Sequence, residues 1–178
     1  MGKGVHTVEL NWFLAGVEQS AFQITRAAVW DTDEALDIVQ EAMFTLPRKY
    51  ASKPEVEWRP LFFRILQNRI RDWHRRSAVR GRVLQESEHD GVDRIEQATD
   101  DGRGNPAQMV TRDDARDVIR QTVATLPARQ QQAFLLRAIE GMNVAETAHA
   151  MRCSQGSVKT HYSRALAVLR EALGEHWE

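Results

Sequence analysis

Apolar side chains recur at intervals of three and four residues along most of the chain, and no segment alternates apolar with polar positions. This period places the apolar groups along one side of an α-helix, so the pattern predicts an all-α protein. A first helix is expected over residues 15–30. Its inward positions are Val17, Ala21, Ile24 and Ala28.

Two further helices are predicted before residue 80. The acidic stretch Asp31–Glu34 suits a helix N-terminus, and the helix that it begins is expected to end at Pro47. After a loop over 47–57, Pro60 suits the first turn of a long helix that ends near Arg76. The positions expected to be buried in these two helices are Leu36, Val39, Met43, Leu46, Phe62, Leu66, Ile70 and Trp73.

An acidic segment comes after the third predicted helix. Residues 77–112 have almost no apolar periodicity, which predicts a linker that is flexible or only partly ordered. The pattern therefore predicts two small helical domains, 8–80 and 113–176, joined by an acidic flexible linker over 81–112.

The helical pattern returns at Arg112. Pro127 separates two helices, and Gly141 suits the position after the second of them, which is expected over 128–140. The apolar positions of this pair are Val118, Val123, Leu126, Phe134, Leu135 and Ile139.

The segment from Asn143 to Leu166 predicts two short helices around a turn. Asn143 is a good N-cap with Glu146 three residues later, and Ser154 can cap the second helix. Arg152 stands where such turns often place glycine, so a left-handed backbone there would cost about 1 kcal/mol. A looser turn is the alternative. The inward positions of the second helix are Val158, Tyr162, Ala165 and Leu169.

The outward side of this last helix is polar and basic without any acid. Hydroxyl and guanidinium groups can contact base edges, and an ammonium group can neutralise a phosphate. This composition suits a helix that enters the DNA major groove, while an ordinary helical hairpin with a polar exterior remains the alternative. The outward residues are Ser157, Lys159, Thr160, Ser163 and Arg164.

The net charge of −1 conceals a strong alternation of charge along the chain. Residues 59–82 hold eight arginines and one acid, 83–114 hold nine acids and three arginines, and 152–170 hold four basic residues and no acid. Two basic segments around an acidic one suggest two contacts with a polyanion. For any single segment, a merely solvated face explains the charge equally well.

Several protein classes are disfavoured by the sequence. A single cysteine excludes a disulfide framework, and the six histidines form no metal-ligand motif. The sequence has no glycine-rich phosphate loop that would suggest an enzyme, and no apolar run long enough to cross a membrane. The N-terminus lacks the apolar core of a signal peptide. We expect a soluble cytoplasmic protein without a metal or cofactor.

Two segments resemble one family. LPARQQQAFLLRAIEGMNVAETAHAMRCSQGSVKTHYSRALAVLREAL is similar to region 4 of bacterial RNA polymerase sigma factors of the extracytoplasmic-function type. DEALDIVQEAMFTL and PLFFRILQNRIRDWHRR resemble region 2 of the same sigma-70 family, in the family's order and spacing. The resemblance implies a non-enzymatic initiation factor that binds core RNA polymerase, recognises −35 and −10 promoter elements and assists melting.

The resemblance also implies roles for individual residues. The clamp helices of the largest polymerase subunit would bind Glu34, Asp37, Gln40 and Glu41. The −10 element would be contacted by Lys49, Tyr50, Ser52, Lys53, Asn68, Asp72 and Arg75, and its phosphates by Arg69, Arg71 and Arg76. The −35 element would be contacted by Ser157, Lys159, Thr160, His161, Ser163 and Arg164. The flap of the second-largest subunit would meet Leu126, Phe134 and Leu135, for which plain core is the alternative.

One departure from the family concerns the −10 loop. The family often has tryptophan at the position of Leu61, and here Trp58 stands nearby as the candidate for that packing. The family also implies an anti-sigma partner. The rival interpretation is an autonomous helix-turn-helix regulator that binds duplex operators, which would need neither the acidic face around Asp37 nor the polar loop.

Overall fold

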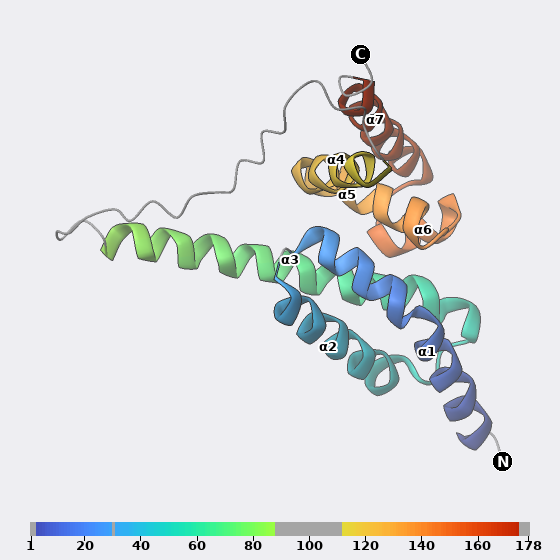
Figure 1. Ribbon diagram of the computed structural model, residues 1–178. Coiled ribbons are helices and arrows are strands. Elements are labelled where there is room, and N and C mark those ends of the chain that lie inside the picture. The colour runs from blue at the N-terminus through green and yellow to red at the C-terminus, as the bar shows by residue number, and fades with distance from the viewer. Residues whose placement is uncertain (1–2, 30, 88–111, 175–178) are drawn as a thin grey trace.

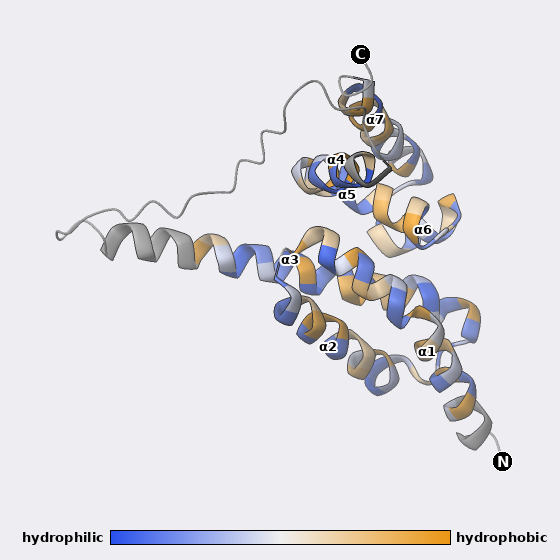
Figure 2. Cartoon of the chain, in the orientation of Figure 1, coloured by the Kyte–Doolittle hydropathy of each residue, from blue (hydrophilic) through white to orange (hydrophobic). Residues whose placement is uncertain are grey.

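The computed structural model describes residues 3–29, 31–87 and 112–174, and the side chains of 7–29, 31–79 and 115–174. Every regular element within these ranges is helical, as the apolar period predicts. Figure 1 shows three N-terminal helices on one side and the group of C-terminal helices packed above them. Along each helix, Figure 2 shows hydrophilic and hydrophobic residues interleaved, as expected for amphipathic helices around a core.

The N-terminal half consists of α1 (Lys3–Ala28), α2 (Thr32–Tyr50) and α3 (Glu55–Ser87). All three pack on one another, and the residues expected to face inward from α1 are buried. The ring of Trp58 is fully buried and lies 6.0 Å from the ring of Phe13, measured between centroids. Trp58 therefore packs in the core of this half, close to the buried Leu61.

Four predicted helix boundaries are wrong, and one of them is the start of the third helix, which begins at Glu55 rather than near Pro60. The first helix begins at Lys3 rather than residue 15, and α2 continues through Pro47 to Tyr50. Proline removes one amide donor, and only one turn of helix comes after it here, so few bonds are affected. The third helix runs on through residues 81–87, for which the sequence predicts a linker, while 88–111 lie outside the described residues.

The buried side of α2 is also rotated from the prediction. Leu36 is 44% exposed, whereas Ala35, Ile38 and Ala42 are buried together with Leu46. Small alanines allow neighbouring helices to approach closely, so these positions face the core although Leu36 is the more hydrophobic residue. Val39 is buried as predicted, and Met43 is partly buried.

The long helix α3 is buried on two sides. Phe62, Leu66 and Ile70 are buried as predicted, and Trp73 is partly buried. Phe63 is fully buried as well, although it lies off the predicted apolar side. The reason is that α6 of the C-terminal half packs along α3.

The C-terminal half consists of α4 (Arg112–Thr125), α5 (Ala128–Phe134), a π-helical turn η1 (Leu135–Ile139), α6 (Val144–Met151) and α7 (Gln155–Gly174). The predicted helix over 128–140 is therefore divided between α5 and η1. Gly141 has φ 70 and comes after this helix as predicted. Among the expected apolar positions, Val123, Leu126 and Leu135 are buried, Val118 and Phe134 are partly buried, and Ile139 is 37% exposed.

Candidate nucleic-acid and polymerase interface

Helix α6 begins with the reciprocal cap that the sequence predicts. The Glu146 amide donates to Asn143 Oδ1 at 2.9 Å, and the Asn143 amide donates to Glu146 Oε2 at 2.8 Å. Helix α7 is capped by Ser154, whose Oγ accepts from the Ser157 amide at 3.0 Å. Both caps are local and satisfy amides that a helix start leaves without partners, so they fix where each helix begins.

The turn between α6 and α7 is tight, and the looser alternative is wrong. Arg152 adopts the left-handed conformation, with φ 53 and ψ 51. The Cys153 amide donates to the Ala148 carbonyl at 3.1 Å, and Arg129 Nη1 donates to the Met151 carbonyl at 2.8 Å. These bonds satisfy carbonyls at the end of α6 and hold Arg152 in a backbone conformation that costs about 1 kcal/mol.

Helix α7 has the two sides that the sequence predicts. Val158, Ala165 and Leu169 are buried, and Tyr162 is partly buried. The Tyr162 ring stacks on Phe134 with centroids 6.4 Å apart, and the Arg137 guanidinium lies 5.5 Å from its centroid. This packing fixes the rotation of α7 and hence the direction of its outward side.

The outward side of α7 is accessible and basic. Lys159, Thr160, Ser163 and Arg164 are exposed, while Ser157 and His161 are partly buried. Within the described residues, neither Lys159 nor Arg164 forms an ion pair with a carboxylate. The arrangement brings a capped helix, with two cations and several hydroxyls, to the surface.

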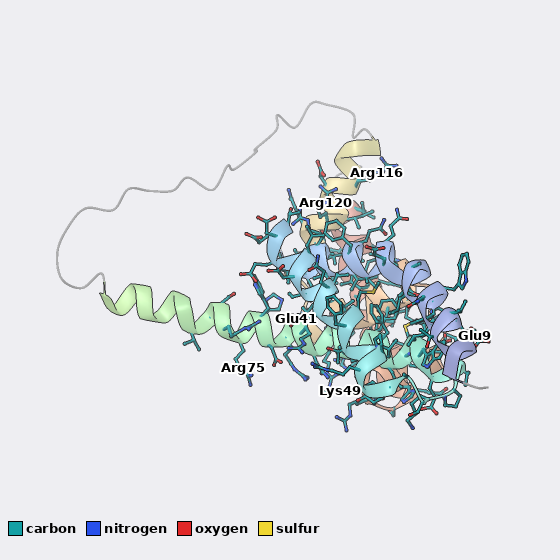
Figure 3. All side chains as sticks on the ribbon, turned by 90° about the horizontal axis from the view of Figure 1, so that it is seen from below. Glu9, Glu41, Lys49, Arg75, Arg116 and Arg120 are labelled. Carbon is teal, nitrogen blue, oxygen red and sulfur yellow. The ribbon has the colours of Figure 1, made fainter. Side chains whose placement is uncertain are left out.

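The acidic side of α2 is accessible too. Asp37, Gln40 and Glu41 are exposed, and Glu34 is partly buried. Glu41 Oε2 lies 3.1 Å from Arg69 Nη1, which connects this acidic side to the arginines of α3. Figure 3 shows Glu41 and Lys49 on the same helix, with Arg75 farther along α3.

The loop expected over 47–57 is shorter than predicted. Only residues 51–54 lie between α2 and α3, so Lys49 and Tyr50 belong to the last turn of α2. Tyr50 is partly buried against the core, and Lys53 Nζ lies 3.6 Å from Glu57 Oε2. Ser52, Lys53 and Lys49 are exposed and remain close together in the chain.

The polar residues of α3 are engaged with one another. Arg71 Nη2 donates to Asn68 Oδ1 at 2.7 Å, and Arg75 Nη2 donates to Asp72 Oδ1 at 3.3 Å. Each pair spans three residues, so both form within this helix. Arg76 is exposed like Arg75.

A direct contact between the two halves was not predicted. Arg59 Nε on α3 donates to Glu140 Oε1 at 2.8 Å, its Nη1 lies 3.8 Å from Glu146 Oε1, and it also donates to the Glu140 carbonyl. Arg64 donates to the His149 carbonyl at the end of α6. These partners are 81 and 85 residues apart, so no local spacing could have revealed them.

The pKa values of two side chains at this contact, Arg64 and His149, are lowered. Burial, and after it the positive charge of Arg152, lowers the pKa of Arg64. Burial and then the charge of Arg64 lower the pKa of His149. Positive charges therefore gather where α3 meets the turn between α6 and α7.

Metal sites and membrane-spanning helices are not found in the described part of the chain. Among the residues described, no three His, Cys, Asp or Glu side chains are grouped so as to hold a metal ion. Across the described ranges, no helix combines the length and the apolar composition needed to cross a membrane.

Residues 116–169 match the family described as Sigma-70, region 4. The chain is also 30% identical, over 69 residues, to the RNA polymerase sigma-H factor of Pseudomonas aeruginosa. That match covers 39% of this chain and 36% of the relative, so the chain matches about a third of the relative's length.

Two solved structures are similar over nearly the whole chain. One is the sigma factor RpoE in complex with the anti-sigma factor NepR from Bartonella quintana, with a TM-score of 0.61, 22% identity, and coverage of 92% of this chain and 96% of that one. The other is CnrH in complex with the cytosolic domain of CnrY, with a TM-score of 0.60, 19% identity, and coverage of 93% and 88%. Both halves of the chain therefore share a known fold.

Proposed function

The chain is related to the sigma factors of the sigma-70 family, with residues 116–169 as its region 4, and on that premise we propose that it is a transcription initiation factor. It binds core RNA polymerase, directs it to particular promoters and assists their melting, and it performs no chemistry itself. The observation that carries this proposal is the outward side of α7, which is basic and exposed and belongs to a helix capped by Ser154.

Helix α7 reads the −35 element in the major groove. Lys159 and Arg164 are exposed cations, and Thr160 and Ser163 add hydroxyls on the same side. A good side-chain contact with a base edge contributes roughly 1–3 kcal/mol of discrimination, and a phosphate contact adds affinity without sequence preference. Ser157 and His161 lie at the edge of this surface, where partial burial limits their reach.

The acidic side of α2 binds the clamp helices of the largest polymerase subunit. Asp37, Gln40 and Glu41 are exposed on one helix, with Glu34 at its start. Charge-assisted hydrogen bonds between carboxylates and arginines are the strong ones, so this surface suits a basic partner. Glu41 would exchange its present partner Arg69 for one on the polymerase.

The −10 element is contacted by the end of α2, the 51–54 loop and α3. Lys49, Ser52 and Lys53 are exposed there, and Tyr50 offers the part of its ring that the core leaves free. A base that binds only when it is unstacked favours the melted promoter. Arg69, Arg71 and Arg76 of α3 contact phosphates. Asn68, Asp72 and Arg75 reach bases after the Arg71–Asn68 and Arg75–Asp72 hydrogen bonds open.

The polymerase flap has one accessible contact in region 4. Leu126 and Leu135 are 6% and 2% exposed, so they serve mainly as core, while Phe134 is partly exposed. Phe134 and Leu135 line an open groove of 830 Å³ between α1 and the α4–η1 segment. Arg116 and Arg120, which project from α4 in Figure 3, line the same groove.

An anti-sigma factor is a further partner of this chain. The similar sigma factor RpoE is bound to the anti-sigma factor NepR, and the likeness to it covers 92% of this chain. Because the same fold can present the same surfaces, a protein that covers the polymerase-binding side of α2 would hold this factor inactive.

The test is transcription from a genomic fragment library with purified core polymerase. Wild-type protein should add defined start sites, and Asp37→Arg should abolish all of them because it reverses a charge on the polymerase-binding side. Glu18→Arg, which reverses an exposed acid on α1, is the matched control and should change nothing. If the wild type adds no transcripts but binds duplex DNA tightly without polymerase, the autonomous regulator replaces this proposal.

A further inference from the structure

A cavity of about 480 Å³ lies between the two halves of the protein. It is bounded by α3 on one side and by α4, α5 and the end of α6 on the other. Its charged or titratable lining consists of Arg71, His74, Arg129 and Arg152, and none of the described residues that line it is acidic. The three arginines come from both halves and are exposed, so a ligand can reach them.

Among the residues that the structure describes, these arginines have no acidic partners. Arg71 donates to Asn68, and Arg129 donates to Gln132 and to the Met151 carbonyl. In the part of the chain that the structure describes, neither they nor Arg152 form an ion pair with a carboxylate. Three positive charges line one cavity that has no acidic lining residue, so an anion bound among them would be stabilised by their charge.

Two nearby donors also lack acceptors. Among the described residues, Gln67 Nε2, which belongs to a lining residue, and Arg64 Nε are buried and have no hydrogen-bond partner. Arg64 does not line this cavity, but it lines a neighbouring hollow together with Arg152. Both atoms are donors, and because Gln67 Nε2 is buried, an acceptor in the cavity would reach it only after the side chain turned toward the ligand.

The remaining wall of the cavity is apolar. Ile70, Leu126 and Met151 line it together with several alanines. A volume of this size lies within the roughly 300–1,000 Å³ that is usual for small-molecule sites. The cavity therefore combines an arginine cluster for an anion with an apolar surface for a flat ring.

We propose that this cavity binds a small molecule bearing a diphosphate, and that the bound ligand holds the two halves of the protein together. Guanidinium groups bind phosphate oxygens in a bidentate manner, which favours phosphate over a monovalent anion. The site extends beyond the proposed DNA and polymerase contacts, because Arg129 and Arg152 belong to neither. Arg71 and Asn68 line the cavity and are also proposed contacts of the −10 element, so a ligand bound in the cavity would compete with promoter DNA.

Calorimetry on the full chain tests binding without polymerase or DNA, so its failure is independent of the proposed function. ADP and inorganic pyrophosphate are titrated separately, with adenosine as a third probe. If ADP binds more tightly than pyrophosphate, the apolar wall contacts a nucleoside and the ligand is a nucleoside diphosphate. If both bind equally, the ligand is a free diphosphate. Absence of binding by both phosphate compounds, or adenosine binding as tightly as ADP, overturns the proposal.

Substitutions at Arg152 locate the site. Arg152→Asn removes the charge but tolerates the left-handed backbone, and it should weaken binding roughly tenfold, as expected for a lost charge-assisted hydrogen bond. Arg152→Lys keeps the charge but loses the bidentate contact, so its affinity should lie between those of Arg152→Asn and wild type. Arg170→Gln removes an exposed arginine of α7 outside the cavity and should have no effect. Equal affinity in Arg152→Asn and wild type would contradict the assignment.

The single cysteine reports whether the ligand closes the two halves. Cys153 is partly buried beside Arg64 and Arg152, and it is the chain's one thiol. The reaction of Cys153 with a thiol reagent should slow several-fold when the phosphate compound that binds in calorimetry is present. In the absence of that compound, Arg59→Ala should accelerate the reaction. An unchanged rate at saturating probe would show that the ligand does not join the halves.

Discussion

Helices α7 and α3 carry the two basic surfaces of the molecule, and more of the cations on α3 have a carboxylate partner. On α7, Lys159 and Arg164 are exposed and form no ion pair within the described residues. On α3, Arg59, Arg69 and Arg75 each form an ion pair with a carboxylate of the protein.

The difference predicts that the two proposed DNA-binding surfaces would bind DNA with different free-energy costs. The outward side of α7 can meet a phosphate or a base edge by releasing water and counterions alone. The polar side of α3 must first give up internal partners, and part of it is covered by α6. The proposed binding of DNA at α3 would therefore be coupled to a rearrangement, which would suit a factor that holds DNA only after melting begins.

The largest expected effect comes from breaking the contact between the halves. Arg59→Ala leaves the Glu140 side chain, which is 7% exposed, without its cation. The free energy of unfolding should fall by about 2 kcal/mol, below the range for fully buried pairs because Arg59 is one-third exposed. Urea denaturation measures it. Arg75→Ala, which breaks an exposed pair, should change the free energy by less than about 0.5 kcal/mol.

A smaller effect is expected on the surface of α7. Arg164→Ala should weaken holoenzyme binding to promoters with a strong −35 element by about 1.5 kcal/mol, within the range for one base contact. Fluorescence anisotropy on promoter duplexes gives the affinity. Arg170→Ala, at the far end of the same helix, is the control. A uniform loss across all promoters would reassign Arg164 to a phosphate.

In the turn between α6 and α7, a substitution is expected to raise the free energy of unfolding rather than lower it. Arg152→Gly removes the side chain from a left-handed position and should raise the free energy of unfolding by about 0.5 kcal/mol, after the entropy of glycine is subtracted. Ala167→Gly, at an exposed position within α7, should lower it by about 1 kcal/mol. Thermal and urea denaturation compare the two, and a loss in both variants would show that Arg152 is not strained.

The weakest effect concerns pH. Burial lowers the pKa of His149 below its ordinary value of 6.5, so the unfolded chain binds more protons as the pH falls below that value. This contribution to stability is present above pH 6.5 and is lost as the pH falls through the lowered pKa. Urea denaturation at about pH 7.5 and about pH 5.5, on either side of that value, should show a smaller decrease for His149→Gln than for wild type. Identical decreases would assign the pH dependence to other groups.

The parts of the fold that depend on neighbouring residues could be predicted from the sequence. The caps at Asn143 and Ser154 involve residues three positions apart, and both are present. The inward positions of α7 can be derived from the helical period and from hydrophobicity together. Where small residues face the core, as Ala35 and Ala42 do in α2, hydrophobicity alone selects the wrong side.

The sequence predicts which residue types form the candidate site, but it predicts less well which elements hold them and which residues they contact. The sequence predicts Tyr50 in a loop, and it lies in a helix because α2 continues past Pro47. The engagement of Arg59 with Glu140 depends on how two domains dock, and pairs so distant in sequence leave no periodic signal. The roles of the DNA- and polymerase-facing residues stay predictions, because the fold positions them without their partners.

The π-helical turn at Leu135–Ile139 determines how the contact between the halves responds to a change in chain length. Its wide geometry lets the Glu140 amide donate to the Leu135 carbonyl at 3.3 Å, five residues back. Five residues of such a turn make about the rotation that four residues make in an α-helix, so deleting one residue here would restore α-helical spacing and keep Glu140 facing Arg59. Deleting one residue from α5, which is already α-helical, would instead rotate Glu140 and the helices after it by about 100° and uncouple the halves, while leaving every residue of both proposed DNA-binding surfaces unchanged.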